Sequence, residues 1–161
     1  KVVRQETKES FRMTVRIVRS IILFSTAASL AVICFGKNII LIISSSEYSA
    51  VYIPFLIMVP GIIAVSAGGL INSFYWGQGY PLKITLAPFA AAALGLILDI
   101  VLLPQIGLAG VTLSFSIANI CWMAYLSVMF SRDSGVSLGE MLIPRISDIR
   151  LFVSKLKGLP A

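Results

Sequence analysis

The chain has 161 residues, of which 58% are apolar and 12% charged, about half the charged share of an average soluble domain. This composition excludes an ordinary soluble domain and indicates a membrane protein. The net charge of +6 has no RNA- or DNA-binding motif beside it, so no nucleic-acid partner is expected. The chain has no His, and its seven acidic residues form no carboxylate pair in sequence. We therefore expect no enzyme activity, metal site or cofactor.

The chain opens with a basic segment, residues 1–16, that we place in the cytoplasm. This segment and the apolar run after it do not form a signal peptide, because the basic part contains Glu6 and Glu9 and no small-x-small cleavage site follows. The first residue is Lys1 rather than Met. We therefore expect the C-terminal part of a longer protein, beginning in a cytoplasmic loop.

Three arginines recur at helical spacing where the basic segment meets the first apolar run. They are Arg12, Arg16 and Arg19. The simplest role for these side chains is to anchor the helix on anionic lipids, and the sharper alternative is contact with the phosphate of a transported lipid. Lys83, in a later turn, belongs to the same group of candidate anionic-lipid or phosphate contacts.

Four apolar stretches are long enough to cross a ~30 Å hydrocarbon core at ~1.5 Å rise per residue. They are Ile17–Phe35, Tyr52–Tyr75, Leu82–Leu103 and Leu108–Phe130. We therefore predict an all-α membrane protein, with a four-helix transmembrane region over residues 17–130. The cytoplasmic tail over 131–161 is too short to bury a core of its own.

Residues that commonly end or kink helices lie between and within these spans. Gly36-Lys37-Asn38 is expected to break the first helix, with Ile39–Ile43 as a short interfacial piece before an outer loop at Ser44–Ala50. The second span contains Pro54 and Pro60, which predict a kink.

Two short connections follow. Gly77–Pro81 is expected to form a tight cytoplasmic hairpin. The third span is expected to stop at Pro104, with a three-residue outer turn before Leu108. Spans two to four are therefore predicted to be sequential antiparallel neighbours.

The third span carries small residues every four positions, Ala87, Ala91 and Gly95, and Asp99 continues the same face. Such a strip lets a neighbouring backbone approach closely. A carboxylate inside a span is costly, so Asp99 is expected to face protein or a cavity rather than lipid. Its role is either a helix-packing hydrogen bond or contact with a substrate or cation.

The fourth span has a polar stripe, Thr112, Ser116, Asn119 and Ser127, and the second span offers Asn72 and Ser73. Stripes of this kind usually form hydrogen bonds between helices, and lining a transport path is the alternative. The candidate substrate or cation contacts are Asp99, Asn119, Ser116, Asn72 and Ser73.

Membrane orientation follows from the basic residues. Twelve of the thirteen fall on one side of this topology: Lys1, Arg4, Lys8, Arg12, Arg16, Arg19, Lys83, Arg132, Arg145, Arg150, Lys155 and Lys157. Only Lys37 is left for the other side. By the positive-inside rule, both termini and the turn at Lys83 are cytoplasmic.

Two runs of residues carry a family resemblance. The first run is Trp76-Gly-Gln-Gly-Tyr-Pro-Leu-Lys83. The second run is Leu98-Asp-Ile-Val-Leu-Leu-Pro-Gln-Ile-Gly-Leu-Ala-Gly-Val-Thr-Leu-Ser114. Together they resemble the C-terminal part of the polysaccharide-export flippases, in the multidrug/oligosaccharidyl-lipid/polysaccharide transporter superfamily. Asp99 stands where that family usually has Asn, and Tyr80 where it has a basic residue.

The resemblance implies the last four helices of a twelve-helix, two-lobe flippase in a bacterial or archaeal cytoplasmic membrane. The implied activity is translocation of an undecaprenyl-diphosphate-linked oligosaccharide for polysaccharide or O-antigen-type export. The implied partners are the lipid bilayer, the lipid-linked oligosaccharide and the missing N-terminal helices of the same protein.

Three alternatives stay open. A multidrug or cation antiporter of the same superfamily would share the fold and use acidic residues for coupling, of which this chain offers Asp99 within a span. A non-transporting membrane subunit would fold alone as four helices. A membrane glycosyltransferase is the least favoured, because it needs paired carboxylates or a metal site.

Overall fold

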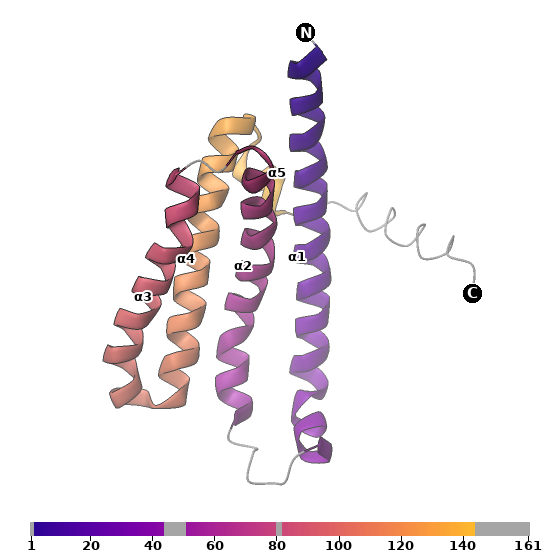
Figure 1. Cartoon of the computed structure of the whole chain (residues 1–161). Helices are drawn as coiled ribbons and strands as arrows, with labels where there is room; N and C mark the ends of the chain where they lie inside the picture. Colours follow the sequence, from indigo (N-terminus) through magenta and orange to yellow (C-terminus); the bar gives the residue numbers. More distant parts are fainter. Residues whose placement is uncertain (1, 44–50, 80–81, 144–161) are drawn as a thin grey trace, which may run out of the picture.

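The computed structural model describes residues 2–43, 51–79 and 82–143, with side chains over 9–36, 51–79 and 82–143. Its helices are α1 (Val2–Ile43), α2 (Tyr52–Gly77), α3 (Leu82–Ile106), α4 (Leu108–Ser134) and the short α5 (Leu138–Leu142). No strand occurs within the described ranges. The first four helices are long and apolar enough to cross a membrane, which confirms the prediction of an all-α, multi-pass membrane protein (Figure 1). The predicted outer loop at Ser44–Ala50 lies outside the described residues.

The helices do not pack in sequence order. α4 packs against both α2 and α3, and α2 packs against α1, so the order across the bundle is α3, α4, α2, α1 (Figure 1). The prediction that spans two to four are sequential neighbours is therefore wrong for α2 and α3. The reason is that small residues admit close neighbours on two sides of α4, with Gly61 of α2 against Ser116 and Gly110 of α4 itself against Leu102 of α3.

The buried core gathers at one end of the bundle. Phe11 of α1, Phe74 of α2 and Phe130 of α4 meet there with ring centroids 5.0 to 5.3 Å apart. Val18, Ile71, Leu126 and Met141 are fully enclosed beside them. Elsewhere the helices present apolar side chains outward, and α3 buries only Ile84. Such outward faces suit contact with lipid or with further apolar helices.

The predicted helix break at Gly36-Lys37-Asn38 is wrong, because α1 continues to Ile43. Gly36 instead serves a contact between helices. A Cβ at this position would lie 3.2 Å from the ring of Tyr52, whose hydroxyl donates a hydrogen bond to the Ile33 carbonyl at 2.6 Å. One glycine costs a helix only ~1 kcal/mol relative to alanine, and an apolar surrounding penalises any backbone group that loses its hydrogen bond.

The predicted stop at Pro104 is also wrong. α3 passes through Pro104 to Ile106, and α4 begins at Leu108, so Gly107 alone joins them instead of a three-residue turn. Gly107 has φ = 61°, a conformation that glycine adopts without strain. Proline removes a single backbone donor, and in the last turn this loss interrupts little of the helix.

The basic residues do gather at one end. The N-terminal part of α1, the start of α3 at Lys83, the end of α4 at Arg132 and the short α5 all lie at the end where the core is densest, and α1 projects beyond the other helices there (Figure 1). The basic residues beyond Ile143 lie outside the described part of the chain.

This arrangement predicts the membrane orientation. In a background with Cys34→Ser and Cys121→Ser, Gln105→Cys should react with a membrane-impermeant thiol reagent on intact cells, and Gln78→Cys should react only after lysis. Both glutamines are exposed and lie at opposite ends of the bundle. The physical reason is the positive-inside rule. Labelling of position 78 but not of position 105 on intact cells would show that the basic end of the bundle faces outward.

Candidate functional site

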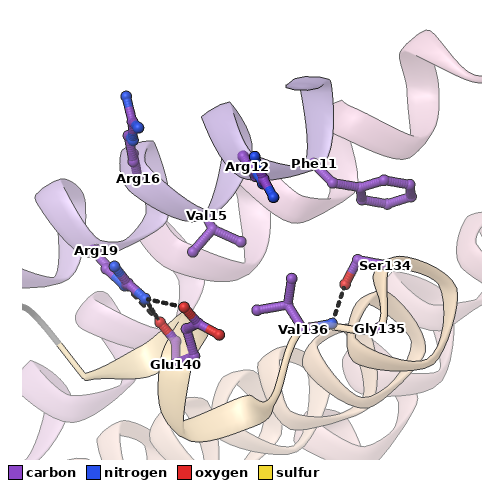
Figure 2. Close-up of a pocket in the computed structure, with 9 residues that line it drawn as sticks. All are labelled: Phe11, Arg12, Val15, Arg16, Arg19, Ser134, Gly135, Val136 and Glu140. Carbon is purple, nitrogen blue, oxygen red and sulfur yellow. Dashed lines mark hydrogen bonds and ion pairs between the residues drawn. The ribbon is translucent and has the colours of Figure 1, made fainter. Parts of the chain in front are cut away.

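Five of the nine predicted site residues line two cavities, one at the basic end and one within the spans. The first, which we call the basic pocket, is a cavity of about 450 Å³ between α1 and the turn that joins α4 to α5 (Figure 2). Its lining is Phe11, Arg12, Val15, Arg16, Arg19, Ser134, Gly135, Val136 and Glu140. The three predicted arginines thus lie around one cavity. Its far wall comes from a segment more than a hundred residues later, which no local sequence pattern could have indicated.

Arg19 forms the buried wall of the basic pocket. It is 5% exposed, and its Nε donates a hydrogen bond to the Glu140 carbonyl at 2.6 Å, with a second from Nη2. Nη2 also lies 3.8 Å from the Glu140 carboxylate. Helix α5 is itself capped by the Ser137 side chain, which accepts a hydrogen bond from the Glu140 N–H at 3.2 Å. Arg19 therefore ties α5 to α1 and is already engaged within the protein.

The turn that closes the pocket is built by local chemistry. Gly135 ends α4 in the left-handed conformation, with φ = 71°. Ser134 donates to the Phe130 carbonyl at 2.6 Å and accepts from the Val136 N–H at 3.2 Å. Just before the turn, the Asp133 carboxylate accepts a hydrogen bond from the Tyr75 hydroxyl at 2.6 Å. These bonds hold the turn against α2 and α4 and so give the pocket a fixed wall.

The second site, the membrane groove, lies between α3 and α4 with Val65 of α2 at its edge. It has a volume of about 590 Å³, and its polar side chains are Asp99 and Asn119. Ala91 and Gly95 of the predicted small-residue strip also line it. A Cβ on Gly95 would lie 3.5 Å from the Ala118 Cβ, so this part of the strip does face a neighbouring helix closely.

Asp99 is half-buried at the groove, and its Oδ1 has no hydrogen-bond partner among the described residues. Trp122 also lines the groove, and its indole N–H likewise has no hydrogen-bond partner among the described residues. Asn119 donates to the carbonyl of Phe115 in its own helix at 2.8 Å. Buried polar atoms are nearly always paired, so this groove suits water, a ligand or a polar group from another helix.

The other predicted contacts lie apart from the groove. Ser116 donates to the carbonyl of Ile57 in α2 at 2.6 Å, which is a hydrogen bond between helices. Ser73 is exposed and donates to the Gly69 carbonyl in its own helix at 2.8 Å. Asn72 is buried at 7% exposure, and its Oδ1 has no partner among the described residues. The structure therefore brings Asp99 and Asn119 together and leaves these three elsewhere.

Lys83 also lies apart from the basic pocket. It is exposed at the start of α3 and lines a mostly apolar recess with Trp122 and Tyr125. The Tyr125 hydroxyl lies 3.5 Å from the Lys83 carbonyl. Lys83 is thus at the same end of the bundle as the three arginines without sharing their cavity.

The most extensive helix contact was not predicted from the sequence. It is the α2–α4 seam, where Gly61 and Gly68 of α2 face α4. A Cβ on Gly61 would lie 2.7 Å from the Ser116 Cα, and one on Gly68 would lie 3.3 Å from the Trp122 ring. The small residues of α2 could have indicated this close packing from the sequence. The prediction was instead based on the more regular small-residue strip of α3.

Cys34 and Cys121 are both free and exposed. Within the described residues, no group of three or more Cys, Asp or Glu side chains could hold a metal ion. Comparisons with family models, with curated proteins and with solved structures find no match to this chain.

Proposed function

We propose that this chain is the C-terminal part of a flippase that moves an undecaprenyl-diphosphate-linked oligosaccharide from the cytoplasmic to the outer leaflet. The observation that carries the proposal is the membrane groove, which holds a carboxylate and a carboxamide between two predominantly apolar helices. Polar side chains at membrane depth normally face a bundle interior or a hydrated cavity.

Two further features support this function. The two runs from Trp76 to Lys83 and from Leu98 to Ser114 resemble the corresponding part of the polysaccharide-export flippases. The apolar outward face of α3, which includes Phe89, Leu96 and Ile100, suits contact with lipid tails or with further helices. A polar glycan needs a hydrated groove, while its lipid tail can stay in the bilayer.

Deletion of the gene tests the proposal. Loss of the protein should abolish export of the glycan and cause its lipid-linked precursor to accumulate in the inner leaflet, and the intact gene should restore export. Precursor orientation can be measured by its access to an impermeant periplasmic glycan-cleaving enzyme. Normal precursor orientation in the deletion strain would contradict the proposal, and a change in drug or cation resistance alone would favour an antiporter.

The antiporter is the second candidate, and the Asp99 carboxylate in the groove is the observation that favours it. Under the flippase proposal, Asp99 gives the groove a polar surface and its charge is not needed, so Asp99→Asn in the intact protein should leave export and its pH dependence nearly unchanged. The amide keeps the shape and hydrogen-bonding capacity of the carboxylate and removes only its charge.

Glycan export is measured across a pH series, with the amount of protein in the membrane as the control. A flattened pH or sodium dependence at normal protein level would assign Asp99 to cation coupling instead.

A further inference from the structure

The basic pocket has the charge of an anion site. Its lining contains three arginines and one glutamate, Glu140, and the carboxylate of this glutamate forms an ion pair with Arg19. The remaining two arginines, Arg12 and Arg16, are exposed and make no hydrogen bond or ion pair with another described residue. The pocket therefore keeps two guanidinium groups that are not neutralised within the described part of the chain.

The spacing of these two arginines allows both side chains to reach one small anion. They are four residues apart on α1, so their Cα atoms are ~6 Å apart along the same face of the helix. Both residues belong to the α1 wall of the pocket. Figure 2 shows the Arg16 side chain extended away from the α5 wall, so the two exposed side chains reach one anion only after Arg16 changes rotamer. A guanidinium presents a planar fork of donors that matches phosphate oxygens in pairs.

Apart from Ser134 and Gly135, the remaining lining is apolar. Phe11 and Val15 of α1 and Val136 of the α4–α5 turn line the same cavity. A volume of about 450 Å³ exceeds what a bare phosphate needs and leaves room for the glycerol part of a lipid headgroup. The apolar run of α1 begins at Ile17, and the α1 residues that line the pocket lie between Phe11 and Arg19, so the pocket lies where that span begins.

We propose that the basic pocket is a phosphate-binding site in which Arg12 and Arg16 hold the phosphate of an anionic phospholipid headgroup or a dissolved phosphate. Arg19 and Glu140 hold the opposite wall in place. This site is separate from the membrane groove and does not depend on the transport activity proposed above.

The experiment uses the intact purified protein and counts retained lipids by native mass spectrometry. Phosphatidylglycerol and phosphatidylcholine are supplied in equal amounts, with and without added inorganic phosphate. The test variant is Arg12→Gln/Arg16→Gln. The matched control is Lys83→Gln/Arg132→Gln, which removes the same charge from the same end of the bundle outside the pocket. Circular dichroism checks that each variant keeps its helices, and Arg12→Lys/Arg16→Lys keeps the charge if the glutamine pair does not fold.

The wild-type protein should prefer phosphatidylglycerol, and the test variant should lose that preference by on the order of tenfold, since the charge-assisted hydrogen bonds from the two guanidinium groups to the phosphate are removed. The control should change it less than about threefold, because its residues lie outside the pocket. A pocket that fills with inorganic phosphate and shows no lipid preference would identify dissolved phosphate as the source. Equal losses in both double variants, or no binding of either phosphate, would overturn the proposal.

Discussion

Gly61→Leu is expected to prevent the stable assembly of the bundle. The first side-chain carbon would lie 2.7 Å from the Ser116 Cα and 2.8 Å from the Phe115 ring, closer than real contacts allow. Because the nearest atom belongs to the backbone of α4, relief requires the two helices to separate. Their separation would also break the hydrogen bond from Ser116 to the Ile57 carbonyl. We expect a loss of more than ~3 kcal/mol of stability, beyond the usual range for overpacking.

Fluorescence-detected size-exclusion chromatography after a heating series measures this effect. The matched control is Gly69→Leu, which makes the same change in the same helix, where no other atom lies within 4 Å of the added carbon. The control should accumulate and elute like the wild type. Equal losses in the two variants would show that the α2–α4 seam is not as close as described.

Arg19→Met is expected to release α5 from α1. The substitution keeps a long apolar side chain and removes the two hydrogen bonds to the Glu140 carbonyl together with the ion pair. Hydrogen bonds from a charged donor contribute about 1.5 to 3 kcal/mol, so the local opening of α5 should become on the order of tenfold to a hundredfold more frequent. Hydrogen–deuterium exchange at the amides of Met141 and Ile143, which bond to carbonyls in this segment, measures that opening.

Glu140→Gln is the matched control for this contact. It keeps the backbone carbonyl that Arg19 binds and removes only the carboxylate charge, which is 44% exposed and therefore screened by solvent. The exchange of Met141 should then rise less than about fivefold. A larger effect of Glu140→Gln than of Arg19→Met would mean that the ion pair, rather than the carbonyl contact, holds α5.

The membrane class and the four apolar spans can be recognised from the amino-acid sequence alone. Tyr52, Leu82 and Leu108 begin helices in the structure as the apolar runs predicted. Hydropathy is a local property, and in a bilayer each apolar segment must satisfy its own backbone hydrogen bonds, so a span can be recognised without knowing its neighbours. The same locality explains the errors at Gly36 and Pro104, because both residues weaken a helix in water more than they do within a packed, apolar bundle.

Which helix faces meet depends on the three-dimensional packing and could not be predicted from the sequence. The position of α4 between α2 and α3, the seam at Gly61 and the contact of Arg19 with Glu140 all join residues that are far apart in sequence. A four-residue spacing shows that a helix has a small or polar face, and it does not show which partner covers that face. The choice depends on side-chain shape at close range. The basic pocket and the membrane groove exist because those choices place α1 against α5 and α3 against α4.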